Sequence, residues 1–429
     1  MEVPLATAPA LPATAAGVPG SMGDVRRSNT ALVLGAVAKA PAGIHPSRAQ
    51  LATATGLTKA SVSSLVLDLL DAGLLHEAGQ SQQGRGRPGV GLELNPARGV
   101  LGMEINVDYI AAGLVDLSGN LLVHEVREQD NRSAGTGPVL AALAGLAGTV
   151  RAAAGERGVE VLGGGLAVPG LVDPAAARIL TAPNLGWANV TLEPGAVLPG
   201  APLGVALFNE ANAAALAEVR HRPKDGSDFL FVSGEVGVGG GLVIGSELFT
   251  GPEGHAGEVG HVVVEPDGTG CSCGGTGCLE TVAGQDAIFA AAGIPTQTAP
   301  GGQAASGLAP GPSGSGHTRS ESLTQLLTAL AARDAEALAA VARAGLYLGV
   351  AVASTVRLLN IPSVVLGGHF AILGEWIRPA LAESLARYAP GKVPAGNISL
   401  SAVGQAGALL GAAGSVVRSL VEAPHRLQG

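Results

Sequence analysis

The sequence lacks three features that mark secreted or membrane proteins. It has only three cysteines in 429 residues, an odd number, and a chain of this length buries enough apolar surface to fold without disulfides. No Lys or Arg precedes Arg26, so the positively charged start of a secretory signal is missing. An apolar run of about 20 residues without glycine or charge, as a membrane span requires, is also missing. These absences predict a cytoplasmic protein with no transmembrane helix.

Charge is distributed unevenly along the chain. Residues 23–98 hold eight Lys and Arg against five Asp and Glu, a formal charge of +3 in a chain of net charge −9, which leaves −12 for the rest. A small basic module joined to a large acidic body predicts that only the first part contacts a polyanion. Residues 1–22 are rich in Ala and Pro and are predicted to be a disordered leader, and the Pro/Gly/Ser segment 295–322 is predicted to be a disordered insert without a functional role.

The basic module is predicted to contain three helices. Ser47 and Gln50 form a capping-box pattern that begins the second helix, and Thr58 is placed to cap the third. The third helix has an apolar stripe on one side, whereas its other side is short and polar, as a helix that enters the DNA major groove requires. The order helix, turn, helix predicts a DNA-binding head for residues 23–98.

Two short strands, 74–77 and 90–94, follow these helices and predict the β hairpin of a winged helix-turn-helix. The segment between them carries Arg85 and Arg87 on a Gly/Pro backbone, which suits the narrow minor groove. An isolated basic loop is more often a solvated surface, and it is the preceding helices that favour DNA. The predicted DNA contacts are Arg48, Thr58, Lys59, Ser61, Ser64, Arg85 and Arg87.

Residues 99–429 alternate glycine-punctuated strands with Ala-rich helices, which predicts an α/β fold. Two hairpin meanders, 100–126 and 228–248, are each followed by helices. This repetition predicts a duplicated core of two lobes with a cleft between them.

All three cysteines, Cys271, Cys273 and Cys278, lie in one glycine-rich loop. The first of them follows His261 by ten residues. Scattered cysteines are most often unpaired core residues, but one imidazole and three thiolates in one loop are the ligand set of a closed tetrahedral zinc site. The predicted cofactor is therefore a structural Zn²⁺ bound by His261 and the three cysteines.

The chain from residue 23 to 420 resembles the ROK family of repressors, open reading frames and kinases. The sequence CSCGGTGCLE after His261 resembles the zinc motif of that family, and EVGH before it resembles its ExGH sugar-binding motif. The resemblance implies a two-lobed body like that of actin and hexokinase, with a zinc loop behind a monosaccharide site. The implied sugar contacts are Gly170, Asn209, Glu210, Glu258, His261 and Glu280.

The motifs that bind ATP in kinases of this family are altered. The first phosphate hairpin, D-x-G-G-T in the kinases, ends here in Asn106, Val107 and Asp108, and Glu235 opens the second, where G-T-G is expected. Side chains and acids in these turns obstruct and repel a polyanion. The catalytic Asp of the kinases is replaced by Glu210, whose carboxylate is one methylene further out.

These departures predict a protein that has lost kinase activity and has no catalytic residue. The predicted function is a sugar-responsive transcriptional regulator, most simply a repressor, that binds an operator as a homodimer or homotetramer. Two alternatives stay open: an active sugar kinase with a DNA-binding head, and a zinc-stabilised scaffold that binds no ligand.

Overall fold

The computed structural model describes residues 22–80, 90–132, 134–220, 222, 228–296 and 318–427. They divide into two compact units, one of residues up to Asn95 together with Ser419–Gly429, and one of Pro96–Arg418. The first boundary lies within three residues of the predicted one. The grouping of the C-terminal residues differs from the prediction, which placed everything after residue 99 in the body, because η6 (Pro424–Leu427) packs against α1 (Met22–Ala38).

The N-terminal unit contains three helices and a two-stranded antiparallel sheet. These elements are α1, α2 (Arg48–Thr55), α3 (Lys59–Asp71), β1 (Leu75–Gln80) and β2 (Val90–Leu94). The Ser47 side chain accepts a hydrogen bond from the Gln50 amide and completes the capping box, and Thr58 caps α3, as the sequence predicts. The helix that begins the unit starts at Met22, the last residue of the predicted leader. Arg85 and Arg87 lie outside the described residues.

The body contains two five-stranded sheets with the same strand order. The first sheet is ordered β10-β6-β3-β4-β5, and the second, read in the matching direction, is β15-β14-β11-β12-β13. In each sheet the first three strands in the chain are antiparallel and the last two add in parallel. This match confirms the predicted duplication.

The strands of the first sheet are β3 (Arg98–Ile105), β4 (Tyr109–Asp116), β5 (Leu121–Glu128), β6 (Glu160–Val168) and β10 (Val205–Asn209). Those of the second sheet are β11 (Phe229–Gly234), β12 (Val238–Ile244), β13 (Glu247–Leu248), β14 (Val364–Gly367) and β15 (Ile398–Leu400). A small antiparallel sheet, β7 (Leu171–Asp173), β8 (Arg178–Ala182) and β9 (Trp187–Thr191), extends from the first lobe. The hairpin turns β3–β4 and β11–β12 are the ones that the sequence analysis compared with phosphate-binding turns.

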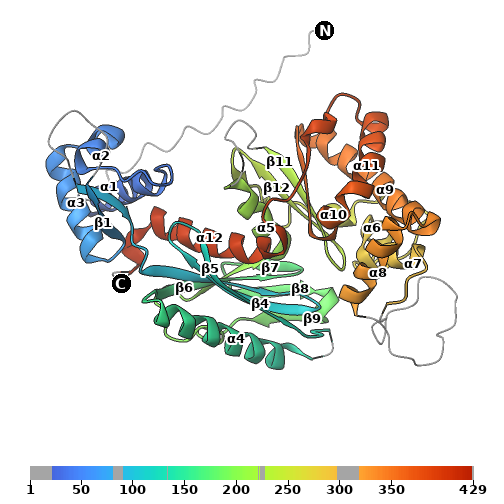
Figure 1. Cartoon of the computed structure of the whole chain (residues 1–429), viewed down its shortest axis with the longest axis horizontal. Coiled ribbons are helices and arrows are strands. Elements are labelled where there is room, and N and C mark those ends of the chain that lie inside the picture. Colours follow the sequence, from blue (N-terminus) through green and yellow to red (C-terminus); the bar gives the residue numbers. More distant parts are fainter. Residues whose placement is uncertain are drawn as a thin grey trace, which may run out of the picture. The chain divides into compact units, whose positions relative to one another are not determined.

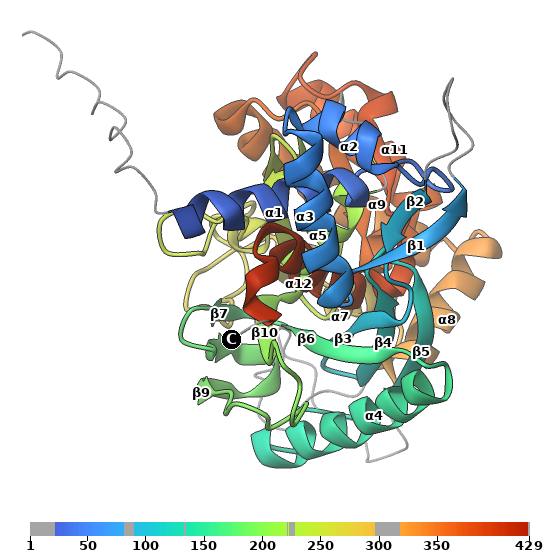
Figure 2. The same cartoon turned by 90° about the vertical axis from the view of Figure 1, so that its left-hand side faces the viewer.

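Helices cover both faces of the first sheet (Figures 1 and 2). The helix α4 (Thr136–Glu156) packs along one face, and α12 (Gly407–Glu422) lies on the other. Glycines allow the second contact, because a Cβ at Gly102 or Gly165 would collide with the backbone of α12. A layer of alanines from α5 (Glu210–Val219) and α12 then fills the space between the two sheets.

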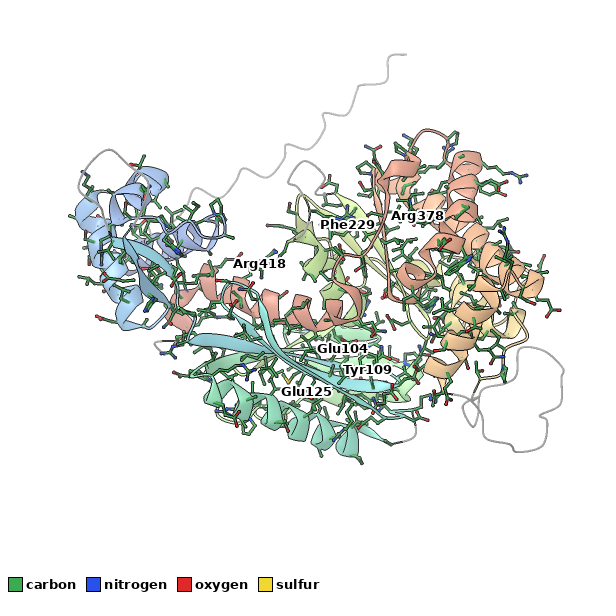
Figure 3. The ribbon with its side chains drawn as sticks, viewed as in Figure 1. Glu104, Tyr109, Glu125, Phe229, Arg378 and Arg418 are labelled. Atoms are coloured by element: carbon green, nitrogen blue, oxygen red, sulfur yellow. The ribbon has the colours of Figure 1, made fainter. Side chains whose placement is uncertain are left out.

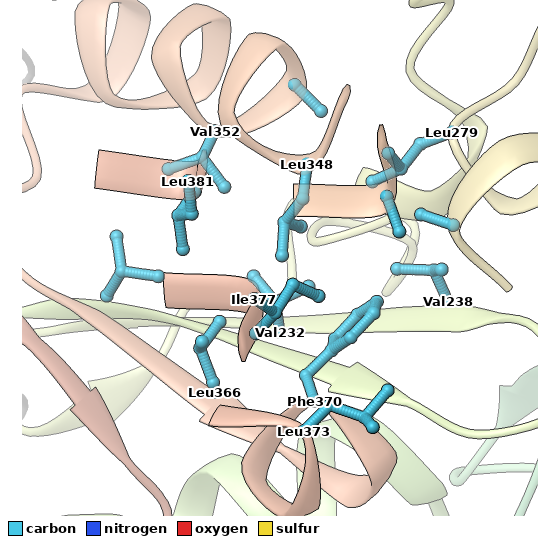
Figure 4. Close-up of a cluster of buried hydrophobic side chains, with 14 of the residues drawn as sticks. Val232, Val238, Leu279, Leu348, Val352, Leu366, Phe370, Leu373, Ile377 and Leu381 are labelled. Carbon is cyan, nitrogen blue, oxygen red and sulfur yellow. The ribbon is translucent and has the colours of Figure 1, made fainter. Parts of the chain in front are cut away.

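The second lobe has the larger apolar core, shown in Figure 4. The long helices α9 (Ala335–Leu359) and α11 (Gly374–Tyr388) pack against each other over the sheet, and Leu348, Ile377 and Leu381 are fully buried between them. Leu279 enters this core directly after Cys278. The cysteine loop is therefore anchored in the core at its C-terminal end.

Two helices of the described chain, α4 and α9, are long and apolar enough to cross a membrane by length and composition alone. Neither is free of glycine or charge, in line with the sequence analysis. Both pack in the α/β body, and 56% of the most apolar window of α9 is buried there. The core helix of a globular domain passes the same test, so these helices do not indicate a membrane protein.

The predicted insert 295–322 is too long at its C-terminal end. Thr318 forms a capping box with Glu321 and begins the helix α8 (Arg319–Ala331), whose Leu326 and Leu330 are buried in the second lobe. The last residues of this Pro/Gly/Ser segment therefore form the cap and first turn of a helix. Residues 297–317 lie outside the described part of the chain.

Candidate functional site

A cavity of about 120 Å³ opens between the two hairpin turns of the body. All six residues predicted to contact a sugar line it: Gly170, Asn209, Glu210, Glu258, His261 and Glu280. They come from both lobes and from the cysteine loop, so the fold brings together residues that are up to 110 positions apart in the chain. The structure places them together, and their role as sugar contacts stays a prediction.

Gly170 and Asn209 form one wall of the cavity. Gly170 has a φ of +91°, and a Cβ there would collide with the backbone of Thr181. The Asn209 side chain accepts from the Asn212 amide at 2.9 Å, which caps α5, and its Nδ2 donates to the Gly170 carbonyl at 2.8 Å. Each half of the amide therefore has one protein partner and keeps one N–H and one lone pair for a hydroxyl in the cavity.

Three carboxyl groups gather where the cavity meets the first sheet. Asn106 Nδ2 donates to Glu210 Oε1 at 3.3 Å, and the hydroxyl of Tyr109 donates to Glu104 Oε1 at 2.6 Å (Figure 3). Glu235, in the β11–β12 turn, approaches from the other lobe and is hydrogen-bonded by Asn106 and Ser233. The fold thus brings three carboxyl groups together beside the β3–β4 turn.

Burial raises the pKa of each carboxyl in this group. The pKa of Glu104 rises to about 7 and that of Glu235 to about 8, mainly because burial disfavours the charged form. The pKa of Glu210 is also well above its ordinary value, through burial first and then through repulsion from Glu235 and Glu104. Protons are therefore shared among these acids near neutral pH.

We expect the free energy of unfolding to fall as pH rises from 6 to 8. The folded protein binds these protons more tightly than the unfolded chain, so the stabilisation is present at low pH and is lost as pH passes through the folded-state pKa values. Glu104→Gln preserves the acceptor for Tyr109 and should remove about 1 kcal/mol of this fall. Urea denaturation at several pH values measures it, with Glu125→Gln on the exposed face of β5 as control. If the free energy of unfolding of Glu104→Gln fell with pH as steeply as that of the unmodified protein, the titrating group would be one other than Glu104.

The cysteine loop forms a group of four ligands beside this cavity. One ligand atom from each of His261, Cys271, Cys273 and Cys278 lies within 4.8 Å of all the others. The Sγ atoms of Cys273 and Cys278 are 3.7 Å apart, close to the roughly 3.8 Å expected for two thiolates bound 2.3 Å from a tetrahedral zinc. The amides of Cys273 and Gly275 also point at thiol sulfurs, as amides that orient metal-bound thiolates do. The residues present therefore fit a metal.

His261 connects the four-ligand group to the cavity. Its Nδ1 faces the Cys271 sulfur at 3.6 Å, and its Nε2 lies 3.8 Å from Glu258 Oε2 in the cavity. The carboxylate of Glu280 lies beside both side chains: its Oε1 is 3.9 Å from His261 Nδ1 and accepts from the Cys271 thiol at 2.9 Å. It also accepts from the Ser272 hydroxyl at 3.4 Å. One imidazole can thus bind a metal through Nδ1 while its Nε2 remains available in the cavity.

A second cavity of about 450 Å³ adjoins the first and shares Asn106 and Glu235 with it. It is lined by both hairpin turns, including Asp108, and by Arg319 of α8. The carboxylates of Asp108 and Glu235 both line this second cavity.

The described residues predicted to bind DNA all lie at the ends or exposed faces of helices α2 and α3. Lys59 and Ser61 are exposed in the first turn of α3. Three of the others already have protein partners: Arg48 pairs with Glu77 at 3.1 Å, the Thr58 hydroxyl caps α3, and Ser64 accepts from Arg26 at 3.1 Å. Lys59 is consequently the clearest free cation on this face among the described residues.

Sequence reasoning missed three residues of the site. Asn184 and Ser272 line the first cavity, and Arg319 lines the second. Asn184 lies in the segment APNLGW, for which the sequence suggested no role, and Ser272 lies between two cysteines of the metal motif. Arg319 was assigned to the low-complexity insert; the Thr-x-x-Glu capping pattern at Thr318 was the available indication that a helix begins there.

Comparison with known proteins agrees with this architecture. The model of the ROK family matches residues 100–418, which is most of the chain. The chain belongs to the ROK family. The xylose repressor of Caldicellulosiruptor bescii is 34% identical over 249 residues, which cover 57% of this chain and 61% of that protein. The glucokinase of Halalkalibacterium halodurans is 33% identical over 241 residues, covering 55% of this chain and 70% of that enzyme.

A solved structure extends the similarity to nearly the whole chain. The crystal structure of a ROK family transcriptional regulator, a homolog of the E. coli MLC protein, aligns with a TM-score of 0.70 and 26% identity over 94% of this chain and 100% of that chain. The sequence alignments are shorter, and the chain spans less than two thirds of the length of the xylose repressor it matches. The predicted ROK membership is confirmed by these comparisons.

Proposed function

We propose that this protein is a sugar-responsive transcriptional repressor of the ROK family. The observation that carries the proposal is the single cavity that gathers Asn209, Glu210, Glu258, His261 and Glu280 next to the four-ligand group. Carboxylates and amides at fixed positions read the hydroxyl stereochemistry of a monosaccharide through paired hydrogen bonds. Similarity to a transcriptional regulator over 94% of the chain, and to a xylose repressor over 57%, supports the regulatory role.

The four-ligand group is proposed to hold a structural Zn²⁺. Three thiolates and one imidazole leave no open position for water, so the metal would organise the loop without taking part in chemistry. Bound to Nδ1 of His261, it would fix the ring whose Nε2 lies beside Glu258. Zinc would thereby orient one wall of the sugar cavity.

The N-terminal unit is proposed to be a winged helix-turn-helix that binds operator DNA in the cytoplasm. The helix α3 would enter the major groove with Lys59 and Ser61, and Arg85 and Arg87 would reach the minor groove. In a homodimer or homotetramer, sugar binding in the body would change the spacing of the DNA-binding units. By linkage, a sugar that weakens DNA binding must bind less tightly to the DNA-bound protein.

The second candidate function is an ATP-dependent sugar kinase, favoured by the similarity to a glucokinase. Against it stand the acids in both phosphate turns, Asp108 and Glu235, and the longer carboxylate of Glu210 in the position of the catalytic Asp. A coupled ATP-turnover assay across hexoses and pentoses separates the two functions. Robust turnover with any of these sugars would overturn the proposed loss of activity.

The proposal is tested by a thermal-shift screen over monosaccharides, followed by an operator-release assay with DNA from the protein's own promoter region. A regulator should be stabilised by one or a few sugars, and the same sugars should change DNA binding at matching concentrations. Stabilisation without any effect on DNA would argue against regulation. No response to any sugar in the screen would favour a zinc-stabilised scaffold.

Lys59→Ala is expected to weaken operator binding about tenfold and to lower the slope of log Kd against log salt concentration by about 1, because one phosphate contact is lost. Fluorescence anisotropy at four salt concentrations measures both values. Lys39→Ala, an exposed lysine of the same unit beyond the end of α1, is the matched control. Equal slopes in the two variants would mean that α3 does not bind the backbone through Lys59.

A further inference from the structure

An ion pair crosses the cleft between the two lobes of the body. Arg319, the first residue of α8, donates from Nε and Nη2 to the two carboxylate oxygens of Asp286 in α7 (Gln285–Ala291), at 2.9 and 2.7 Å. Its Nη1 donates to Asp108 Oδ1 in the β3–β4 turn, at 3.0 Å. The helices α7 and α8 contribute to the core of the second lobe, whereas β3 and β4 belong to the first. One guanidinium therefore joins the two lobes.

The geometry favours a strong interaction. The side chain of Arg319 is only 7% exposed, so its charge is less screened than that of a surface pair. The bidentate contact with Asp286 holds the planar guanidinium in place and leaves Nη1 as a fixed donor toward the other lobe. Because Asp286 alone still satisfies most of the guanidinium, loss of Asp108 would not leave a buried charge without a partner.

The Asp108 end of this link leads to the proposed sugar cavity. The backbone N–H of Asp108 donates to Asn106 Oδ1 at 3.3 Å, and Asn106 Nδ2 donates to Glu210 Oε1 at 3.3 Å. Asn131 supports the same turn, because its Nδ2 donates to the carbonyls of Asn106 at 2.7 Å and Tyr109 at 3.0 Å. The turn that Arg319 holds is therefore the turn that orients Glu210.

We propose that Arg319 is a positioning residue that links the lobes through Asp108 and keeps the sugar cavity in its binding arrangement. Asp108 replaces the threonine of the kinase phosphate motif. Its carboxylate is the acceptor for Arg319. The second lobe thus contacts the turn through a protein cation, in the half of the cleft where a kinase holds its nucleotide. This inference rests on the proposed sugar binding.

A link of this kind sets sugar affinity through the fraction of molecules in the binding arrangement. Asp108→Asn keeps the shape of the side chain and the Arg319–Asp286 pair but removes the charge that crosses the cleft. We expect the Kd for D-xylose or D-glucose, whichever binds the full-length protein in isothermal titration calorimetry, to rise about tenfold. The matched control is Glu160→Gln, since Glu160 pairs with Arg98, at 2.6 Å, within the first lobe and outside the lining of both cavities. Its Kd should equal that of the unmodified protein.

Two further measurements separate positioning from general stability. Arg319→Met and the double variant with Asp108→Asn should bind the sugar equally weakly, because both remove the same link. Amides of the β3–β4 turn should exchange hydrogen faster in Asp108→Asn than in Glu160→Gln, with or without sugar. An Asp108→Asn variant with an unaltered Kd and unaltered exchange overturns the inference. If no monosaccharide of the screen binds the unmodified protein, the sugar-dependent part fails with the proposed function, and the exchange measurement still decides whether the link holds the turn.

Discussion

Cys273→Ser is expected to abolish stoichiometric zinc binding and to lower the melting temperature of the body by roughly 10 °C or more. Structural zinc sites contribute on the order of 10 kcal/mol to the folding of the segments they organise, and serine is a poor ligand for zinc. Cys273 is exposed, so the substitution removes a ligand without opening a cavity in the core. The loss of stability should therefore come from the metal and not from packing.

Elemental analysis after dialysis measures the zinc content, and differential scanning calorimetry measures the melting temperature. Thr276→Ala, exposed in the same loop, is the matched control and should keep one zinc per chain. Treatment of the unmodified protein with a chelator should reproduce the melting temperature of Cys273→Ser, and added zinc should restore only the unmodified protein. Unchanged zinc content in Cys273→Ser would refute the assignment of the site.

The resemblance to the ROK family implied the six residues of the sugar cavity, whereas the parts that the sequence predicts by itself are set by short segments of the chain. The metal ligands and the two hairpin turns each lie within about 20 residues, so their composition and spacing constrain the local fold directly. The duplication was also predictable. Two hairpin meanders of similar composition, each followed by helices, indicate the same α/β unit repeated in the chain. Such patterns depend on neighbours in sequence.

Two of the missed features depend on contacts between distant residues. Arg319 meets Asp108 across 211 positions, and no local pattern encodes that pairing. The packing of the C-terminal residues with α1 is likewise a long-range contact. Composition also gave a wrong prediction at residues 318–322, where Thr318 and Glu321 form a helix cap, because Ser and Thr favour both caps and disordered linkers.

The two ring nitrogens of His261 face different groups, which implies that metal binding and sugar binding can be separated by mutation. Nδ1 faces the cysteines and Nε2 faces Glu258, so a change at Glu258 alters the cavity but leaves all four proposed metal ligands in place. A change at a cysteine should alter both, because the ring of His261 loses the partner that fixes it. Cys273→Ser and a variant of Glu258 therefore have different expected signatures.

Glu258→Gln is expected to weaken sugar binding about 10- to 100-fold while zinc content and the melting temperature without sugar stay unchanged. Replacing the carboxylate by an amide of the same shape removes a charged hydrogen-bond acceptor, which is worth about 1.5–3 kcal/mol when it binds a hydroxyl. Calorimetric titration with D-xylose and D-glucose measures the Kd, and operator release should shift to proportionally higher sugar concentration. Glu253→Gln, exposed nearby in the chain and absent from the cavity lining, is the control. If Glu258→Gln bound sugar as tightly as this control, the carboxylate would not contact the ligand, and recognition would have to rest on the other predicted contacts, Gly170, Asn209, Glu210, His261 and Glu280.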